Sequence, residues 1–123
     1  MHVGLIKNFT ADGPIGKRRL VTFGSAEGRV ALAGIGAVLL GTTAIRGAAG
    51  AGERIDVCLD HIREVEFGGT VAYGDPLTSD AAGRAIKADP GVGASLPIIG
   101  RAMSAGGLGV IGHVLIQPAT LRG

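Results

Sequence analysis

Large aromatic side chains and cysteine are scarce in this chain. Aromatic residues make up 3% of the 123 residues and tryptophan is absent, so a core must be built from Val, Ile, Leu and Ala. Such a core gains less free energy per buried residue, which favours help from oligomerisation or from a partner surface. The single cysteine, Cys58, excludes an intrachain disulfide and fits a reducing compartment.

A dense charge of one sign is also missing. The net charge is only +2, and the basic residues are dispersed apart from Lys17-Arg18-Arg19. Nucleic-acid binding requires a basic stripe and, for single strands, stacking aromatic rings. We therefore expect no nucleic-acid partner. The basic triplet is either a solvated patch or a contact for an acidic partner surface.

No apolar run is long enough to suggest a membrane span. The longest uncharged segment runs from Val30 to Ile45 and is interrupted by Gly34, Gly36 and Gly41. A spanning helix needs about 20 apolar residues. We interpret the segment as two buried strands joined by a turn at 34–36, with membrane association as the alternative. The first residues also lack the features of a signal peptide, which fits synthesis in the cytoplasm.

Glycine, by contrast, is abundant, with 23 copies spread along the chain. Because glycine inside a helix costs about 1 kcal/mol relative to alanine, this distribution argues against long helices and favours turns and bulges. Short apolar runs alternate with glycine-rich breaks, which is typical of an all-β fold, either a small β-barrel or a jelly-roll-like sandwich. The expected strands are 20–23, 29–33, 38–42, 54–61, 64–67, 84–88, 98–103 and 110–117.

The first 18 residues are expected to form an extended N-terminal arm. Polar and turn-forming residues break any apolar periodicity in this stretch, among them Asp12, Gly13 and Pro14. The β-barrel or sandwich domain is then expected to occupy residues 19–123.

The chain also resembles a diverged internal duplication. Leu39-Leu40-Gly41 recurs as Ile98-Ile99-Gly100, and a slightly smaller spacing relates Ala26–Arg29 to Ala81–Arg84. Two similar halves are expected when neither half can bury its apolar face alone. The first of these spacings also takes Gly47 to Gly106, Gly50 to Gly109, Ile55 to Val114 and Val57 to Ile116.

Two loops could be read as ligand sites. The loop Gly47–Gly52 is rich in glycine, but Glu53 follows it where a phosphate-binding loop needs lysine, and a carboxylate there would repel phosphate. Asp75 and Asp80 could face a cation, but two carboxylates without a third ligand are better explained by turn formation. We therefore expect no cofactor.

The residues of a catalytic centre are not assembled in any motif. The segment 102–106 places Ser104 in a pattern close to a nucleophile elbow, but alanine stands where the first glycine is required. His61 and His113 are the candidate bases, and both lie in strand-like runs. The histidines and Cys58 show no metal-ligand spacing. We predict neither an enzyme nor a metal site, with a small hydrolase using Ser104 as the alternative.

One stretch in the second half carries a family resemblance. Val71–Leu77 is followed by Asp80, by Gly83-Arg84 and then by Pro97–Ala102, with Gly109 and Val114 further on. In this pattern the chain resembles the capsid cement, or head decoration, proteins of tailed bacteriophages. The resemblance covers most of residues 20–118 and leaves the arm unmatched. The residues expected to form its structural turns are Gly74, Asp75, Pro76, Asp80, Gly83 and Gly100.

This resemblance implies a non-enzymatic virion protein on the outer surface of the mature capsid. Such a protein would clamp neighbouring major capsid protein subunits against internal DNA pressure, and would associate with itself, with a trimer favoured over a dimer. A β-barrel adaptor or host-attachment module is the alternative. In the arm, we expect apolar anchors at Val3, Leu5, Ile6 and Phe9, and steering charges at Lys17, Arg18 and Arg19.

Overall fold

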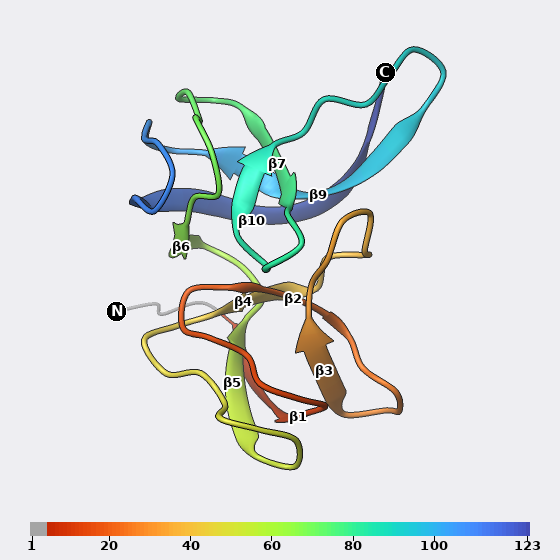
Figure 1. Ribbon diagram of the computed structural model, residues 1–123, viewed down its shortest axis with the longest axis vertical. Helices are drawn as coiled ribbons and strands as arrows, with labels where there is room; N and C mark the ends of the chain where they lie inside the picture. The colour runs from red at the N-terminus through yellow and green to blue at the C-terminus, as the bar shows by residue number, and fades with distance from the viewer. Residues whose placement is uncertain (1–4) are drawn as a thin grey trace.

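The chain forms two β lobes that follow one another along the long axis of the molecule (Figure 1). A computed structural model describes residues 5–123. The N-terminal lobe contains β1 (Ile6–Ala11), β2 (Leu20–Phe23), β3 (Arg29–Leu32), β4 (Gly41–Thr43) and β5 (Arg54–Cys58). The C-terminal lobe contains β6 (Ile62–Glu66), β7 (Pro76–Ser79), β8 (Ala85–Lys87), β9 (Ser95–Ala102) and β10 (Ile111–Arg122).

Both lobes wrap their strands in the same way. The N-terminal lobe is a closed barrel in the order β1-β3-β2-β4-β5, in which β1 pairs in parallel with β3 and antiparallel with β5. The C-terminal lobe is a five-stranded sheet in the order β6-β10-β9-β7-β8. An isolated parallel bridge between Phe67 and Ala85 joins the two edges of this sheet. The expected all-β fold is confirmed, and of its two forms the structure adopts the small β-barrel.

The two lobes are structural repeats of one another. The antiparallel pair Val21–Gly41 recurs as Leu77–Gly100, and the parallel pair Ala11–Val30 recurs as Phe67–Ala85. The hairpin glycines Gly28 and Gly83 both have positive φ, at 78° and 75°. The internal duplication expected from the sequence is therefore present, with Gly41 matched to Gly100 and Gly28 to Gly83.

The last strand of each repeat aligns differently from the sequence expectation. Val57 pairs with Lys7 and Thr43, while Val114 pairs with Arg63 and Ala102, the residues at the equivalent strand positions. Val57, and not Ile55, is thus the counterpart of Val114. The loop before the last strand is shorter in the second repeat, at residues 103–110 compared with 44–53, and this accounts for the shift.

A shared core holds the lobes together. One cluster of buried side chains fills the N-terminal barrel and includes Phe9, Val21 and Val57. The other fills the C-terminal lobe but also contains Leu20, Ala33 and Leu39 from the N-terminal lobe.

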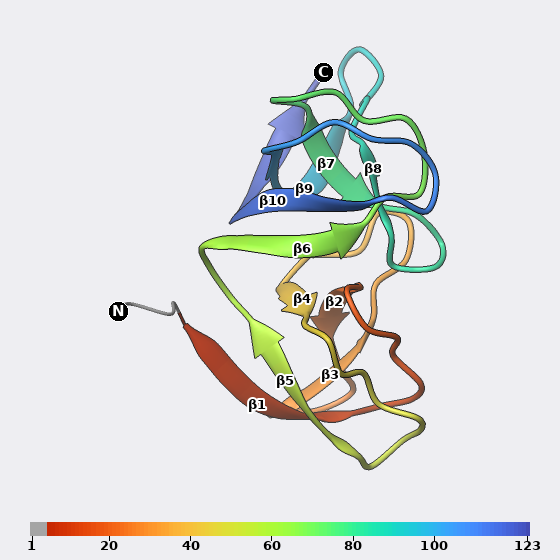
Figure 2. The same ribbon diagram turned by 90° about the vertical axis from the view of Figure 1, so that its left-hand side faces the viewer.

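Backbone hydrogen bonds cross the same junction. The Leu20 N–H donates to Gly83 O (2.7 Å) and the Glu66 N–H donates to Arg18 O (3.1 Å). Figure 2 shows β6 running across the junction, directly above β4 and β2. The two lobes therefore form one packed unit.

The expected N-terminal arm is wrong for the segment that forms β1. Residues Ile6–Thr10 pair one for one with Cys58–Arg54 of β5, and Phe9 and Ala11 point into the barrel core. β1 is the strand that closes the barrel between β3 and β5, whose edges would otherwise be open. The boundary between an arm and a barrel at residues 18 and 19 does not exist in this part of the chain.

The uncharged segment from Val30 to Ile45 is built as expected from strand, turn and strand. It comprises most of β3, a connecting loop at residues 33–40, and β4. Within residues 5–123 no helix has the length and apolar character needed to cross a membrane.

Candidate binding surface

The apolar residues expected to anchor a partner are only partly available. Leu5 and Ile6 are exposed, and the Leu5 N–H donates a hydrogen bond to Asp60 Oδ1 (2.6 Å). Phe9 is buried in the barrel, and the ammonium of Lys7 lies 5.5 Å from the centre of its ring. Val3 lies outside the described residues. Of the candidates that the structure describes, Leu5 and Ile6 are the two whose side chains a partner could reach.

Two of the three basic residues at 17–19 are engaged inside the molecule. Arg18 Nε lies 3.4 Å from Glu64 Oε1, and Arg19 Nη1 lies 3.0 Å from Glu66 Oε1. Both carboxylates belong to β6, so these ion pairs join the N-terminal lobe to the C-terminal lobe. Lys17 is exposed. It is the member of the triplet that could contact an acidic surface.

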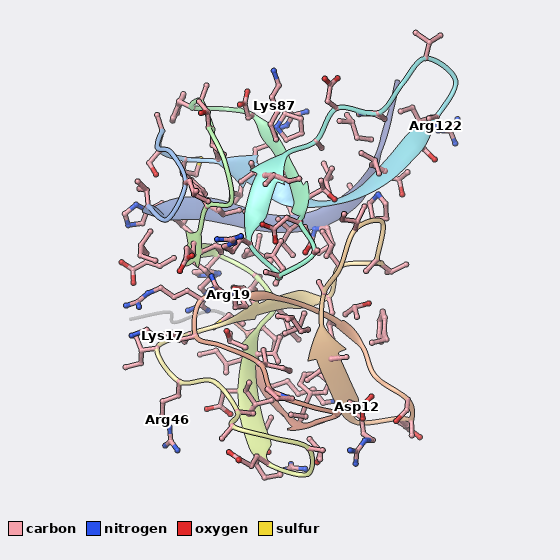
Figure 3. The ribbon with its side chains drawn as sticks, viewed as in Figure 1. Asp12, Lys17, Arg19, Arg46, Lys87 and Arg122 are labelled. Carbon is pink, nitrogen blue, oxygen red and sulfur yellow. The ribbon has the colours of Figure 1, made fainter. Side chains whose placement is uncertain are left out.

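A second exposed cation lies on the same side of the molecule as Lys17. Figure 3 shows Lys17, Arg19 and Arg46 along one side, with Asp12 on the other side. Arg46 lies in the loop after β4 and lines a surface cleft together with Asn8 and Asp56. This side of the N-terminal lobe therefore presents Lys17 and Arg46 to solvent.

Each lobe has an Asp–Arg pair that fixes one hairpin. In the N-terminal lobe, Asp12 Oδ2 accepts the Ser25 N–H (2.6 Å) and Asp12 Oδ1 pairs with Arg29 Nε. The hydrogen bond from Arg29 is the main reason that the pKa of Asp12 lies below its usual value, and the Ser25 N–H contributes next. In the C-terminal lobe, Asp80 Oδ2 accepts the Arg84 Nε–H (3.1 Å).

The two aspartates occupy exchanged positions in the repeat. Asp12 follows β1 and faces Gly24 after β2, whereas Asp80 follows β7 and faces Gly68 after β6. A Cβ at Gly24 would lie 2.7 Å from Asp12 Oδ2, and a Cβ at Gly68 would lie 2.3 Å from Asp80 Oδ2. There is room for one carboxylate between the ends of the two strands. The residue that faces this carboxylate from the other strand end must therefore be glycine.

Of the residues expected to form structural turns in the second half, Gly74, Asp75, Asp80 and Gly83 lie in or beside turns, whereas Pro76 and Gly100 lie in the strands β7 and β9. Asp75 Oδ2 accepts the Ala72 N–H (2.9 Å), and Gly74 has φ of 87°. Gly74 O accepts a hydrogen bond from Arg101 Nη1 (3.1 Å), and Pro76 begins β7. The carboxylate of Asp75 therefore stabilises the turn to which Asp75 belongs.

A cleft at the lobe junction contains the cysteine. It has a volume of about 210 Å³ and is lined by Arg18, Thr43, Ala44, Ile45, Cys58, Ile62, Arg63 and Glu64. Cys58 is buried, and its burial raises the pKa of the thiol, so the thiol stays protonated at neutral pH.

The hydroxyl of Ser104, the candidate nucleophile, is engaged by the backbone. The Ser104 hydroxyl oxygen accepts the backbone N–H of His113 (2.9 Å), and this bond ties the 103–110 loop to β10. In the part of the chain that the structure covers, residues 5–123, no three His, Cys, Asp or Glu side chains are placed to hold a metal ion.

Two equivalent loops present exposed apolar tips that the sequence reasoning did not single out as a pair. The loop between β3 and β4 turns at Gly34-Ile35-Gly36-Ala37, and the loop between β8 and β9 turns at Gly91-Val92-Gly93-Ala94. Both turns close with the same hydrogen bond, from Ala37 N–H to Gly34 O (3.3 Å) and from Ala94 N–H to Gly91 O (2.9 Å). Gly36 and Gly93 have φ of 76° and 79°.

The side chains at the two tips point into solvent. Ile35 is 78% exposed and Val92 is fully exposed. The recurrence of Gly-Ile-Gly-Ala as Gly-Val-Gly-Ala is the sequence signal that could have identified the pair. Figure 1 shows both loops on the right-hand side, each at the upper end of its own lobe.

The tandem β-barrel repeat defines this chain as an all-β protein of two similar lobes. No protein-family model matches the sequence, and no curated protein matches it either. Among solved structures, the chain is similar in fold to the head fiber gp8.5 N base of bacteriophage phi29. The TM-score is 0.72 and the identity 16%, over 97% of this chain and 98% of that one.

Proposed function

We propose that this chain is a non-enzymatic structural protein of a tailed bacteriophage head that binds the outer surface of the mature capsid. In this role it clamps neighbouring major capsid protein subunits against internal DNA pressure. The observation that carries the proposal is the likeness of fold to a phage head fiber base over nearly the whole length of both chains. The resemblance of Val71–Ala102 to capsid cement proteins supports the same conclusion from the sequence.

The rigid two-lobed form suits a clamp. Because the lobes share a core, a force applied to one lobe is transmitted to the other instead of being absorbed by a flexible linker. A protein with two linked contacts also binds far more tightly than either contact alone. The chain is made in the host cytoplasm and associates with itself, with a trimer favoured over a dimer, which multiplies the number of contacts again.

The proposal is tested by co-sedimentation of the purified protein with particles of the phage that encodes it. We expect the protein to sediment with expanded, undecorated capsids and to raise the temperature at which DNA-filled heads burst. Size-exclusion chromatography with light scattering gives the oligomeric state of the free protein. A protein that leaves expanded capsids bare at saturating concentration would overturn the proposal and favour an adaptor or host-attachment module.

A further inference from the structure

We propose that the turns Gly34–Ala37 and Gly91–Ala94 are a bivalent docking element, in which Ile35 and Val92 each insert into the same apolar pocket on two neighbouring copies of one partner subunit. This inference rests on the proposed function and adds the residues that make contact. We call the two turns the tip loops.

The geometry of the tip loops does not require apolar residues at their tips. The closing hydrogen bond from the fourth to the first residue, with positive φ at the third, defines a type II turn in both loops. Such a turn requires glycine or asparagine at its third position, where Gly36 and Gly93 stand, and favours proline at its second. Exposed Ile35 and Val92 occupy that second position without any demand from the turn itself.

A second pair of equivalent turns shows which residues the two lobes share when no partner contact constrains the residue at the tip. By the same shift that moves the last strand, Gly109 corresponds to Gly52 and not to Gly50, and both have positive φ. The turn Gly50-Ala51-Gly52 in the N-terminal lobe thus corresponds to Gly107-Leu108-Gly109 in the C-terminal lobe. The glycines are retained there, but the tip residues differ in size, alanine in one lobe and leucine in the other. Of these two pairs of turns, the tip loops are the pair with a β-branched apolar residue in both lobes.

Equivalent tips point to equivalent pockets. Two turns of similar sequence, Gly-Ile-Gly-Ala and Gly-Val-Gly-Ala, which share a closing hydrogen bond and lie at the same end of two similar lobes, fit two copies of one binding site. The partner is therefore a surface that repeats a single subunit, as a capsid shell does. The first tip loop and its flanks, residues 33–41, contain no charged residue, so the pocket that receives it is apolar.

A lipid surface is the less favoured occupant. Membrane-inserting loops combine apolar tips with flanking cations. The residues around the first tip loop offer none, and only the second tip loop has a cation beside it, Arg122, which lines a cleft with Gly93 and Ala94. A single β-branched side chain at each tip also suits a side-chain-sized pocket better than a bilayer.

The inference is tested with Ile35→Asp, Val92→Asp and the double variant, measured for binding to expanded capsids of the encoding phage. Leu108→Asp is the matched control, since Leu108 is 68% exposed at the tip of another Gly-x-Gly turn. Because the tips make no core contact, we expect all variants to keep the thermal unfolding midpoint of the unchanged protein.

We expect each single variant to weaken binding by a similar factor, between about 10² and 10⁴, because each reduces the attachment of every protomer from two points to one. The double variant should not bind detectably, and Leu108→Asp should bind as the unchanged protein does. Undiminished binding by either single variant would overturn the bivalent element while leaving the proposed function intact. Failure of the unchanged protein to bind capsids, or its binding to anionic lipid vesicles instead, would overturn both.

Discussion

At the scale of single residues, close backbone approach determines which glycines are indispensable. Gly100 has φ of 150° and lies opposite Ile116 in β10, next to an irregularity in the β9–β10 pairing. A Cβ built on Gly100 would lie 1.7 Å from Leu115 O, and one built on its counterpart Gly41 would lie 2.4 Å from Cys58 O. Both barrels thus require glycine where the fourth strand crosses the fifth.

The substitution Gly100→Ala is therefore expected to destabilise the protein by about 2–5 kcal/mol, because it adds both a steric clash and backbone strain. The free energy of unfolding from a urea titration measures the effect. Gly107→Ala is the control, since a Cβ there meets nothing within 4 Å. We expect that variant to stay within about 1 kcal/mol of the unchanged protein. Equal stability of the two variants would contradict this explanation.

At the scale of elements, the same hairpin is held in each lobe by an aspartate that comes from a different strand end. Asp12 reaches Arg29 from the end of β1, and Asp80 reaches Arg84 from the end of β7. The exchange shows that the hairpin needs one carboxylate beside its arginine. This carboxylate can come from the end of either of the two neighbouring strands. The pair is a structural device of the fold and takes no part in the proposed binding.

The lowered pKa of Asp12 makes its contribution to stability dependent on pH. A carboxyl group whose folded-state pKa lies below its unfolded value, near 3.8, stabilises the fold above that value. This contribution is lost as the pH falls through the folded-state pKa. We expect the urea midpoint to be flat from neutral pH to about pH 4 and to fall below it.

The substitution Asp12→Asn should lower the midpoint at pH 7 and reduce the loss on acidification. Asp89→Asn serves as the control, because Asp89 is exposed and forms no ion pair among the described residues. An Asp12→Asn variant with the same acid-induced loss as the unchanged protein would show that the pair does not act in this way.

The elements that the sequence predicted well are those with a clear alternation of apolar and polar residues. The strand expected at 54–61 alternates in this way and contains β5, whereas the strand expected at 20–23 coincides with β2 as a short apolar run. β1 was missed because Lys7 and Asn8 are exposed and Thr10 is partly exposed, which leaves Phe9 and Ala11 as the buried markers of the strand. Closure of the barrel depends on pairing between distant segments, which local periodicity does not encode.

The candidate site was less predictable than the fold. Arg18 and Arg19 looked available from the sequence, but they pair with β6 carboxylates brought alongside by the packing of the two lobes. Only a comparison of the two halves of the sequence could have pointed to Ile35 and Val92. A single apolar residue in a glycine-rich turn does not by itself indicate a binding site. Exposure, which decides what a partner can reach, comes from the folded chain.

At the scale of the whole molecule, duplication gives one chain two copies of the tip loop at a fixed separation. The buried side chains of Leu20, Ala33 and Leu39 fix that separation, because they belong to the N-terminal lobe and pack into the core of the C-terminal one. A rigid pair of contacts is suited to a partner with a regular repeat. The tip loops are the proposed points at which the clamp contacts the shell.

Electron cryomicroscopy of expanded heads saturated with the purified protein tests this account most directly. We predict two-lobed density on the outer surface, in which the β3–β4 loop of one lobe and the β8–β9 loop of the other contact two neighbouring subunits of the shell. Bare particles would contradict the proposed function, and attachment to a single subunit through one lobe would contradict the clamp.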